Sequence, residues 1–119
     1  MTASAALLGL LAVALGAFGA HGLEDHLTET EKGWWETATF YALVHAVAAL
    51  AISLSDRRRS LGPAAWMFLA GASLFSATLY AMAIGAPRVL GAVTPVGGVG
   101  MIAGWALIGY KSLRRPPAP

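Results

Sequence analysis

The stretch PAAWMFLAGASLFSATLYAMAIG, from Pro63 to Gly85, decides the fold class because it contains no charged side chain. A transmembrane α-helix needs about 20 predominantly apolar residues to cross the hydrocarbon core of a bilayer. Three other apolar blocks lie in the chain, at about residues 4–20, 34–54 and 93–110. The sequence therefore predicts an all-α membrane protein, a bundle of four transmembrane helices joined by short loops.

The composition supports the membrane class and excludes several others. The 119 residues are 57% hydrophobic and 12% charged, whereas an ordinary soluble domain carries about 25% charged residues. The chain has no cysteine, which excludes disulfides, thiolate nucleophiles and sulfur-ligated metals. Its net charge of +2 comes from basic residues at the ends of the apolar blocks, so we expect no nucleic-acid partner. We expect one integral membrane domain over residues 1–119.

The first apolar block has two interpretations. Ala17-Phe18-Gly19 resembles the small-x-small site at which a signal peptide is cleaved. A signal peptide requires a positively charged segment before its apolar residues. However, no Lys or Arg precedes the apolar residues of this block. We therefore expect a retained helix.

The basic residues predict how the helices are oriented in the membrane. Most of them follow the second and fourth apolar blocks: Arg57, Arg58, Arg59, Lys111, Arg114 and Arg115. The others, Lys32 and Arg88, lie in the remaining two connections. Short segments rich in Lys and Arg stay in the cytoplasm. We therefore expect the N and C termini to be cytoplasmic.

Local signals predict where helices begin and which aromatic residues anchor them. Thr28-x-x-Glu31 matches a capping box, so the second helix is expected at about 29–54. Trp34 and Trp35 fit an aromatic anchor at the membrane interface. Pro63 suits the first turn of the third helix, whose predicted range is 63–85. Trp105 lies deeper in the fourth helix and is expected to be a packing residue whose indole N–H needs a partner.

Small residues predict how the helices pack, because lipid provides little hydrophobic drive for helix association. Ala12, Gly16 and Ala20 form a stripe at four-residue spacing, and Gly100 and Gly104 form a GxxxG pair. The third helix has a similar seam: Ala70, Gly71, Ser73, Ala77 and Ala81. These seams predict an intramolecular four-helix bundle. The alternative is that one seam faces a second protomer or another subunit.

His45 is the polar residue of most interest inside the predicted helices. The helix interiors contain no Asp, Glu, Lys or Arg, which disfavours an ion-coupled transporter. Thr37 and Tyr41 share the helix face of His45 at four-residue spacings. With Tyr80 they could line a polar groove near the bilayer midplane. The alternative is a structural histidine, satisfied by a carbonyl or hydroxyl of the third or fourth helix, where the available side chains are Ser73, Ser76, Thr78 and Tyr80.

The first connection holds histidines among acidic residues. His21, Glu24, Asp25 and His26 could form a surface metal site, but they match no recognised ligand spacing. His21 and His45 would lie roughly 15 Å apart in depth at the rise of an α-helix, too far to share one ion. We expect no metal and no cofactor.

Three short motifs, in order along the chain, resemble a known family. Residues 16–23 read GAFGAHGL, and residues 35–46 fit the pattern W-x-T-x3-Y-x3-H-A. Residues 91–98 read GAVTPVGG and are followed by Gly104-Trp105. Over essentially its whole length the chain resembles a family of small four-helix bacterial inner-membrane proteins of unknown function, which is related to eukaryotic transmembrane protein 256.

The resemblance singles out certain motif positions: His21, Gly22, Trp35, Thr94, Pro95, Gly97 and Gly98. It implies four transmembrane helices and a multi-pass protein of the bacterial inner (plasma) membrane, but no substrate or reaction. The chain departs from the family pattern at residues 76–80, which read SATLY where SGSLY is usual. It also departs at residues 42–44, which are less polar than usual and make a polar groove along the second helix less well supported.

These features favour a non-catalytic accessory or scaffold protein that packs against a larger membrane complex or self-associates. No nucleophile–base pair or metal cluster is evident in the sequence, so we do not expect an enzyme. The alternative is a binder or carrier of lipid, quinone or another small molecule, using the groove predicted around His45.

Overall fold

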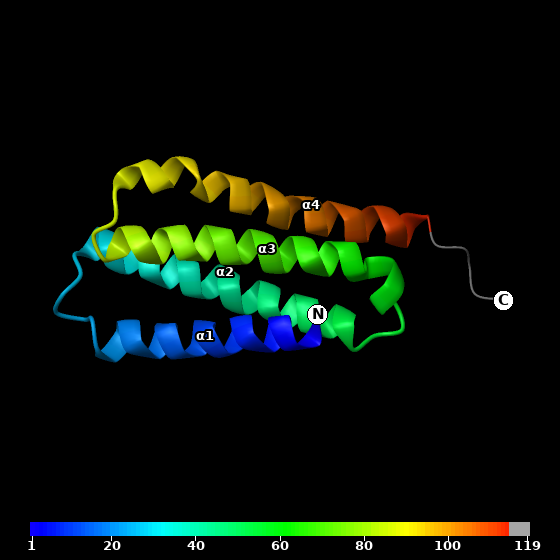
Figure 1. The fold of residues 1–119 in the computed structure, drawn as a ribbon, viewed down its shortest axis with the longest axis horizontal. Helices are drawn as coiled ribbons and strands as arrows, with labels where there is room; N and C mark the ends of the chain where they lie inside the picture. Colours follow the sequence, from blue (N-terminus) through cyan, green and yellow to red (C-terminus); the bar gives the residue numbers. More distant parts are fainter. Residues whose placement is uncertain (115–119) are drawn as a thin grey trace.

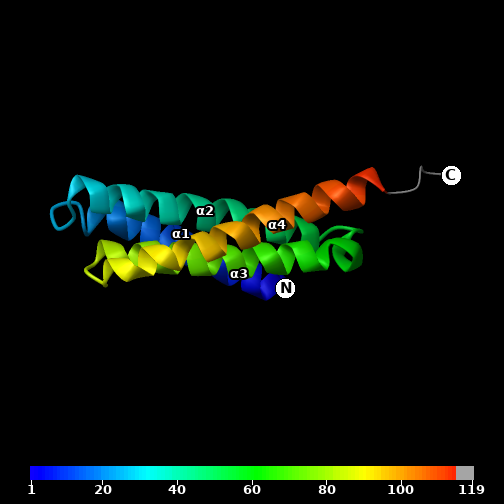
Figure 2. The same ribbon diagram turned by 90° about the horizontal axis from the view of Figure 1, so that it is seen from above.

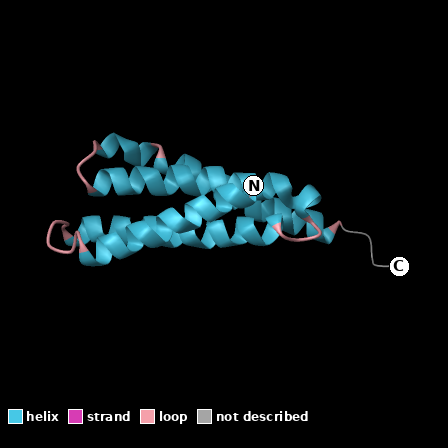
Figure 3. Ribbon diagram, turned by 60° about the horizontal axis from the view of Figure 1, so that its bottom comes forward, coloured by secondary structure: helices cyan, strands magenta, loops and turns pink. Residues whose placement is uncertain are grey.

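The chain folds into four long α-helices in the computed structural model, which describes residues 1–114 (Figure 1). They are α1 (Thr2–His21), α2 (Glu29–Ser53), α3 (Arg58–Ala83) and α4 (Thr94–Leu113), and a short 3-10 helix, η1 (Arg88–Ala92), precedes α4. All four are long and apolar enough to cross a membrane, which confirms the predicted fold class. Short loops join them, and the described part of the chain contains no strand (Figure 3). Arg115, part of the predicted basic cluster, lies outside the described residues.

The residues at the helix ends explain where two of the helices begin and end. The Thr28 side chain accepts a hydrogen bond from the Glu31 backbone N–H at 3.2 Å, and the Glu31 carboxylate accepts one from the Thr28 N–H at 2.9 Å. This predicted capping box satisfies N–H groups that the first turn of α2 leaves free. Gly85 has φ +110° just after α3. That left-handed conformation, which favours glycine, lets the Ala86 N–H reach the Ala81 carbonyl at 2.9 Å and closes the helix.

The third helix begins five residues earlier than predicted, at Arg58 rather than Pro63. Pro63 therefore lies in the second turn, where its missing N–H leaves the carbonyl four residues back without its usual helical partner. Two other hydrogen bonds support the first turn of the helix. The Leu61 N–H bonds to the Arg57 carbonyl at 2.7 Å, and the Lys111 ammonium of α4 donates to the Ser60 carbonyl.

The helices α2 and α3 form the centre of the bundle, with α1 and α4 on opposite sides (Figure 1). The helix α1 packs mainly on α2, and α4 packs mainly on α3. Figure 2 shows that α4 is inclined to α3, so that α4 begins beside the end of α3 and crosses toward α2. The result is an open arrangement in which each outer helix is covered by the bundle on one side.

Close packing of α1 on α2 follows a spacing that alternates between three and four residues. The α1 residues on this face are small: Ala5, Gly9, Ala12, Gly16 and Gly19. This alternation is the heptad spacing of helices that cross at a small left-handed angle. The predicted stripe at strict four-residue spacing differs, because Ala20 is exposed and Gly19 lies in the contact instead. A Cβ on Gly19 would overlap the Trp35 indole, and one on Gly16 would lie 2.8 Å from Thr39 Cγ2.

Glycines also allow α3 and α4 to approach each other closely. A Cβ on Gly97 would lie 2.5 Å from the Gly71 carbonyl oxygen, and one on Gly71 would lie 2.7 Å from the Gly97 carbonyl oxygen. A Cβ on Gly104 would lie 2.6 Å from the Phe68 ring, and one on Gly100 3.4 Å from Gly71 Cα. The GxxxG pair therefore faces α3 of the same chain.

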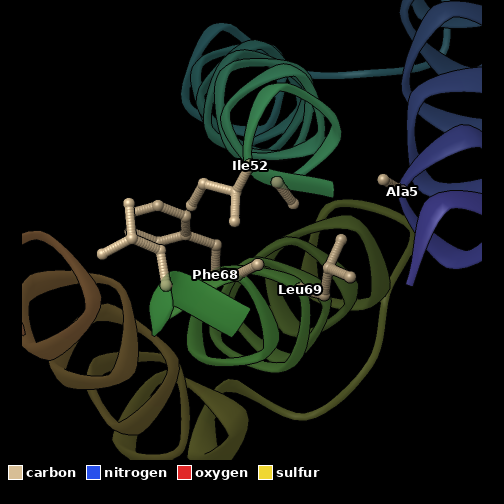
Figure 4. Close-up of a cluster of buried hydrophobic side chains, with 7 residues drawn as sticks. Ala5, Ile52, Phe68 and Leu69 are labelled. Atoms are coloured by element: carbon tan, nitrogen blue, oxygen red, sulfur yellow. The ribbon is translucent and has the colours of Figure 1, made fainter. Parts of the chain in front are cut away.

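A smaller apolar cluster, formed by Ala38, Leu79 and Met82, lies toward the end of the bundle where α2 begins. The larger cluster lies in the half of the bundle near the α2–α3 connection (Figure 4). It brings together Ala5 of α1, Ile52 of α2, and Phe68 and Leu69 of α3. Figure 4 shows Leu69 on the side of α3 that faces Ala5 and Phe68 on the side away from it. Phe68 also packs against Trp105 of α4, with ring centroids 4.7 Å apart. One turn of α3 thus contacts both outer helices.

Candidate functional site

His45 is buried in the middle of the bundle, at 4% exposure, and both of its ring nitrogens have partners. Its Nδ1 lies 2.7 Å from the Tyr41 carbonyl oxygen, and its Nε2 lies 3.0 Å from the indole Nε1 of Trp105. A carbonyl can only accept and an indole N–H can only donate. The bonding therefore assigns the neutral tautomer with the proton on Nδ1, and leaves neither nitrogen free for a ligand.

Trp105 provides the contact between α4 and His45. Its indole N–H donates to the imidazole, and its ring packs against Phe68. The side chain is also 49% exposed, so one edge faces outward. Trp105 is therefore a packing residue whose indole N–H has a partner, as predicted, and that partner is His45. The histidine is satisfied by a carbonyl of its own helix and by an indole, not by the hydroxyl groups considered from the sequence.

Among the four residues of the predicted polar groove, Tyr41 and His45 lie side by side, with their rings stacked and the centroids 6.0 Å apart. Thr37 is exposed, whereas the Tyr80 hydroxyl lies 2.5 Å from the hydroxyl of Thr39. Thr39 lies two residues after Thr37 on α2, and this places its hydroxyl toward α3. Tyr41 is 38% exposed and packs against Phe75 with ring centroids 4.9 Å apart. Thr39, which the sequence reasoning missed, takes the place expected for Thr37.

Other polar side chains inside the bundle also join one helix to another. Ser76 of α3 donates to the Ala38 carbonyl of α2 at 2.7 Å. The hydroxyl groups of Thr78 on α3 and Thr94 on α4 lie 2.7 Å apart. Trp35 of α2 donates its indole N–H to a carbonyl of α1, that of Leu15, at 2.7 Å.

Trp35 differs from the interfacial anchor predicted for it. The side chain is 6% exposed and packs edge-on against Tyr80, with ring centroids 4.5 Å apart. The neighbouring Trp34 instead lies near the outside of the bundle end, where the Arg88 guanidinium sits 5.6 Å from its ring centroid. The glycine at position 19 makes room for the Trp35 indole, and this requirement for space explains why Trp35, not Trp34, turns inward.

The buried polar side chains in the described part of the bundle are all hydrogen-bonded. Over residues 1–114, no buried side-chain nitrogen or oxygen lacks a hydrogen-bond partner. An unpaired polar group is costly in lipid, because no water is present to replace the missing bond. Interhelical hydrogen bonds of this kind stabilise membrane bundles by a modest amount each, about 0.6 kcal/mol on average. Trp35, Ser76 and Thr78 therefore use their polar atoms to connect one helix to another.

The motif positions lie mostly at helix ends and close helix contacts. Gly22 follows α1, and its N–H bonds to the Phe18 carbonyl at 2.6 Å, while His21 is exposed in the last turn. Thr94 and Pro95 begin α4, and Gly97 lies in the contact with α3. A Cβ on Gly98 would make an ordinary contact with Phe75 at 3.9 Å. Within residues 1–114, no group of three or more His, Asp or Glu side chains is positioned to hold a metal ion.

A groove of about 730 Å³ lies between α1 and α2, at the end of the bundle where those helices are connected. Its lining combines small residues of α1, aromatic and aliphatic residues of α2, and charged residues at its mouth. They are Gly16, Gly19, Ala20, Glu24, Leu27, Lys32, Trp35, Glu36, Thr39, Phe40, Leu43 and Val44. No pattern in the sequence predicts this groove, because it depends on how two helices cross.

The helices and their internal polar contacts define the class of this molecule: it is a multi-pass helical protein of the bacterial inner (plasma) membrane. A family model described as "Protein of unknown function (DUF423)" matches residues 15–98. The chain belongs to this family, as the motifs predicted.

Three curated relatives support the assignment over nearly the whole chain. A UPF0382 membrane protein of Staphylococcus epidermidis is 41% identical over 111 residues, covering 92% of this chain and 91% of the relative. The UPF0382 inner membrane protein YgdD of Escherichia coli K12 is 42% identical over 113 residues, covering 92% and 86%. The UPF0382 membrane protein YwdK of Bacillus subtilis is 40% identical over 107 residues, covering 87% of each. No solved structure is significantly similar to the chain.

Proposed function

We propose that the protein is a non-catalytic accessory or scaffold subunit, which packs against a larger membrane complex or against a second copy of itself. The observation that carries the proposal is the use of the intramembrane polar groups. The side chains that would be candidates for chemistry, His45, Tyr80 and Trp105, are engaged in hydrogen bonds between helices. A nucleophile or a general base needs a free polar atom within reach of a substrate.

The open bundle gives such a subunit surfaces for association. On α3, the small side chains of Ala70, Ser73 and Ala77 face outward at spacings of three and four residues. Small residues at such spacings allow a second helix to approach closely. The predicted seam of α3 is therefore divided, because Gly71 faces α4 while these three remain available to a partner.

The alternative of a cofactor or small-molecule groove at His45 has less support. Tyr41 and His45 lie side by side, but Thr37 is exposed, the Tyr80 hydroxyl is bonded to Thr39, and both nitrogens of the imidazole are occupied. A bound lipid, quinone or pigment that is detected by mass spectrometry and lost on His45→Ala would restore this alternative.

The association test combines solution mass with site-specific crosslinking. We expect the purified chain in mild detergent to have a protein mass clearly above the 12.3 kDa of one copy, measured by light scattering with the detergent contribution subtracted. Because the chain has no cysteine, Ser73→Cys introduces a single thiol on the exposed face of α3. We expect it to crosslink in native membranes.

The matched control is Val99→Cys, on an exposed position of α4. It should crosslink much less than Ser73→Cys if the α3 face is the contact. A strict monomer in mild detergent, combined with no crosslink from Ser73→Cys in membranes, would contradict the proposed function.

A further inference from the structure

The groove between α1 and α2 has the shape and polarity of a site for an amphiphile. Its volume of about 730 Å³ falls within the range of small-molecule sites, about 300–1,000 Å³. The walls deep in the groove are apolar and include Phe40, Leu43 and Val44. These side chains extend the groove along α2 by about 12 Å from Glu36 to Val44 at the rise of an α-helix. An acyl chain fits such a wall.

The mouth of the groove carries charge, which distinguishes it from an ordinary lipid-facing crevice. Glu24, Lys32 and Glu36 all line it. The Lys32 ammonium also lies 3.4 Å from the carboxylate of Glu29, a side chain that is 95% exposed. The two carboxylates that line the groove outnumber the one ammonium, so the mouth favours a headgroup that brings a positive charge.

We propose that this groove binds one phospholipid with a primary-amine headgroup, its ammonium at Glu24 and Glu36 and its acyl chain along Phe40, Leu43 and Val44. A primary ammonium has three N–H groups to donate to carboxylates. Lys32 is placed to accompany the phosphate of the same lipid. A headgroup with a quaternary ammonium has no N–H to donate, and an anionic headgroup meets the excess of carboxylates. The proposal is independent of the association proposed above.

The experiment measures how many lipids the full-length protein retains in native mass spectrometry. The purified chain is mixed with equal amounts of phosphatidylethanolamine, phosphatidylcholine and phosphatidylglycerol in mild detergent. We expect one phosphatidylethanolamine to be retained in preference to the other two. In the variant with both Glu24→Gln and Glu36→Gln, retention of phosphatidylethanolamine should fall about tenfold, as the loss of charge-assisted contacts predicts.

Two controls separate recognition of the lipid from general effects of charge or folding. Asp25→Asn removes the same charge from the neighbouring residue, which is exposed and does not line the groove, and should leave retention unchanged. Ala20→Leu fills the groove wall and should reduce retention of all three lipids, whereas Ala14→Leu on an exposed part of α1 outside the lining should not. Circular dichroism checks that each variant remains helical.

Any of four results would overturn the proposal. Equal retention of phosphatidylcholine or phosphatidylglycerol would show that the ammonium is not recognised. Unchanged retention in the variant without the two carboxylates, Glu24→Gln with Glu36→Gln, would show that the lipid binds elsewhere. Retention of no lipid, or a crosslinked second copy of the chain seated in the groove, would show that the groove is not a lipid site.

Discussion

The contact between His45 and Trp105 links α2 to α4 across the centre of the bundle, and it fixes the tautomer of a buried imidazole. Thr39 and Tyr80 make an equivalent link between α2 and α3. Each of these polar residues would be an unsatisfied group in lipid without its partner. At the residue scale these polar side chains therefore act in pairs. The stability lost when one member is replaced depends on whether its partner is present.

A double-mutant cycle tests the pair formed by His45 and Trp105. We expect Trp105→Phe and His45→Ala each to lower the free energy of unfolding, because each removes one partner of the hydrogen bond. The coupling between them should be about 0.6 kcal/mol and no more than about 1.7 kcal/mol, the range of interhelical hydrogen bonds in membrane proteins. Unfolding by sodium dodecyl sulfate in mixed micelles provides the measurement. Strictly additive effects would show that the two side chains do not interact.

The glycine under the Trp35 indole gives a second prediction at this scale. Gly19→Ala places a methyl group where the indole lies, so Trp35 must move and its bond to the Leu15 carbonyl is lost. We expect a loss of about 1–3 kcal/mol of stability, as in other overpacked sites. Gly33→Ala is the control, because nothing lies within 4 Å of its added Cβ, and it should gain about 0.5–1 kcal/mol from the better helix propensity of alanine. Equal effects of the two substitutions would contradict the packing described for Gly19.

At the scale of whole helices, hydropathy and capping predicted the number of helices and the start of α2. The first and fourth helices extend a little beyond their predicted ranges of 4–20 and 93–110, to Thr2 and Leu113. The early start of α3 was not predicted because Pro63 matches a first turn equally well, and one of the contacts that support the turn before it comes from Lys111, which is distant in sequence. The rotation of each helix about its own axis could not be predicted. That rotation decides whether Thr37 or Thr39 faces Tyr80, and it depends on contacts between helices.

The close approach of α3 and α4 supplies a prediction about an element as a whole. We expect Gly97→Ala to separate these helices, because the added Cβ would lie 2.5 Å from the Gly71 carbonyl oxygen and 2.6 Å from the Phe75 backbone nitrogen. Backbone atoms cannot move aside as a flexible side chain can, so stability should fall by about 1–3 kcal/mol or more.

The matched control on the same helix is Gly109→Ala, since no atom lies within 4 Å of a Cβ at that position. Thermal unfolding in micelles, followed by circular dichroism, compares the two variants. If Gly97→Ala were as stable as Gly109→Ala, the helices would not be held together at Gly71 and Gly97.

At the scale of the whole molecule, the fold places the basic residues at two ends in unequal numbers. Lys111 of α4 donates to the Ser60 carbonyl, so the basic C-terminal end of α4 lies beside the α2–α3 connection. The contact of Arg88 with Trp34 brings the α3–α4 connection to the start of α2, at the opposite end. The basic residues within the described chain thus divide into Arg57, Arg58, Arg59, Lys111 and Arg114 at one end and Lys32 and Arg88 at the other.

This division predicts that the end carrying Arg57 to Arg59, and with it both termini, faces the cytoplasm. Because the sequence contains no cysteine, a single introduced cysteine is the one thiol of the protein that a maleimide can label. In intact cells, a membrane-impermeant maleimide should label Thr30→Cys and should label Ser60→Cys only after the membrane is permeabilised. Both positions are exposed, so access, not burial, decides the result. The reverse pattern of labelling would place the acidic mouth of the α1–α2 groove on the cytoplasmic side. A phospholipid bound there would then come from the cytoplasmic leaflet and not from the outer one.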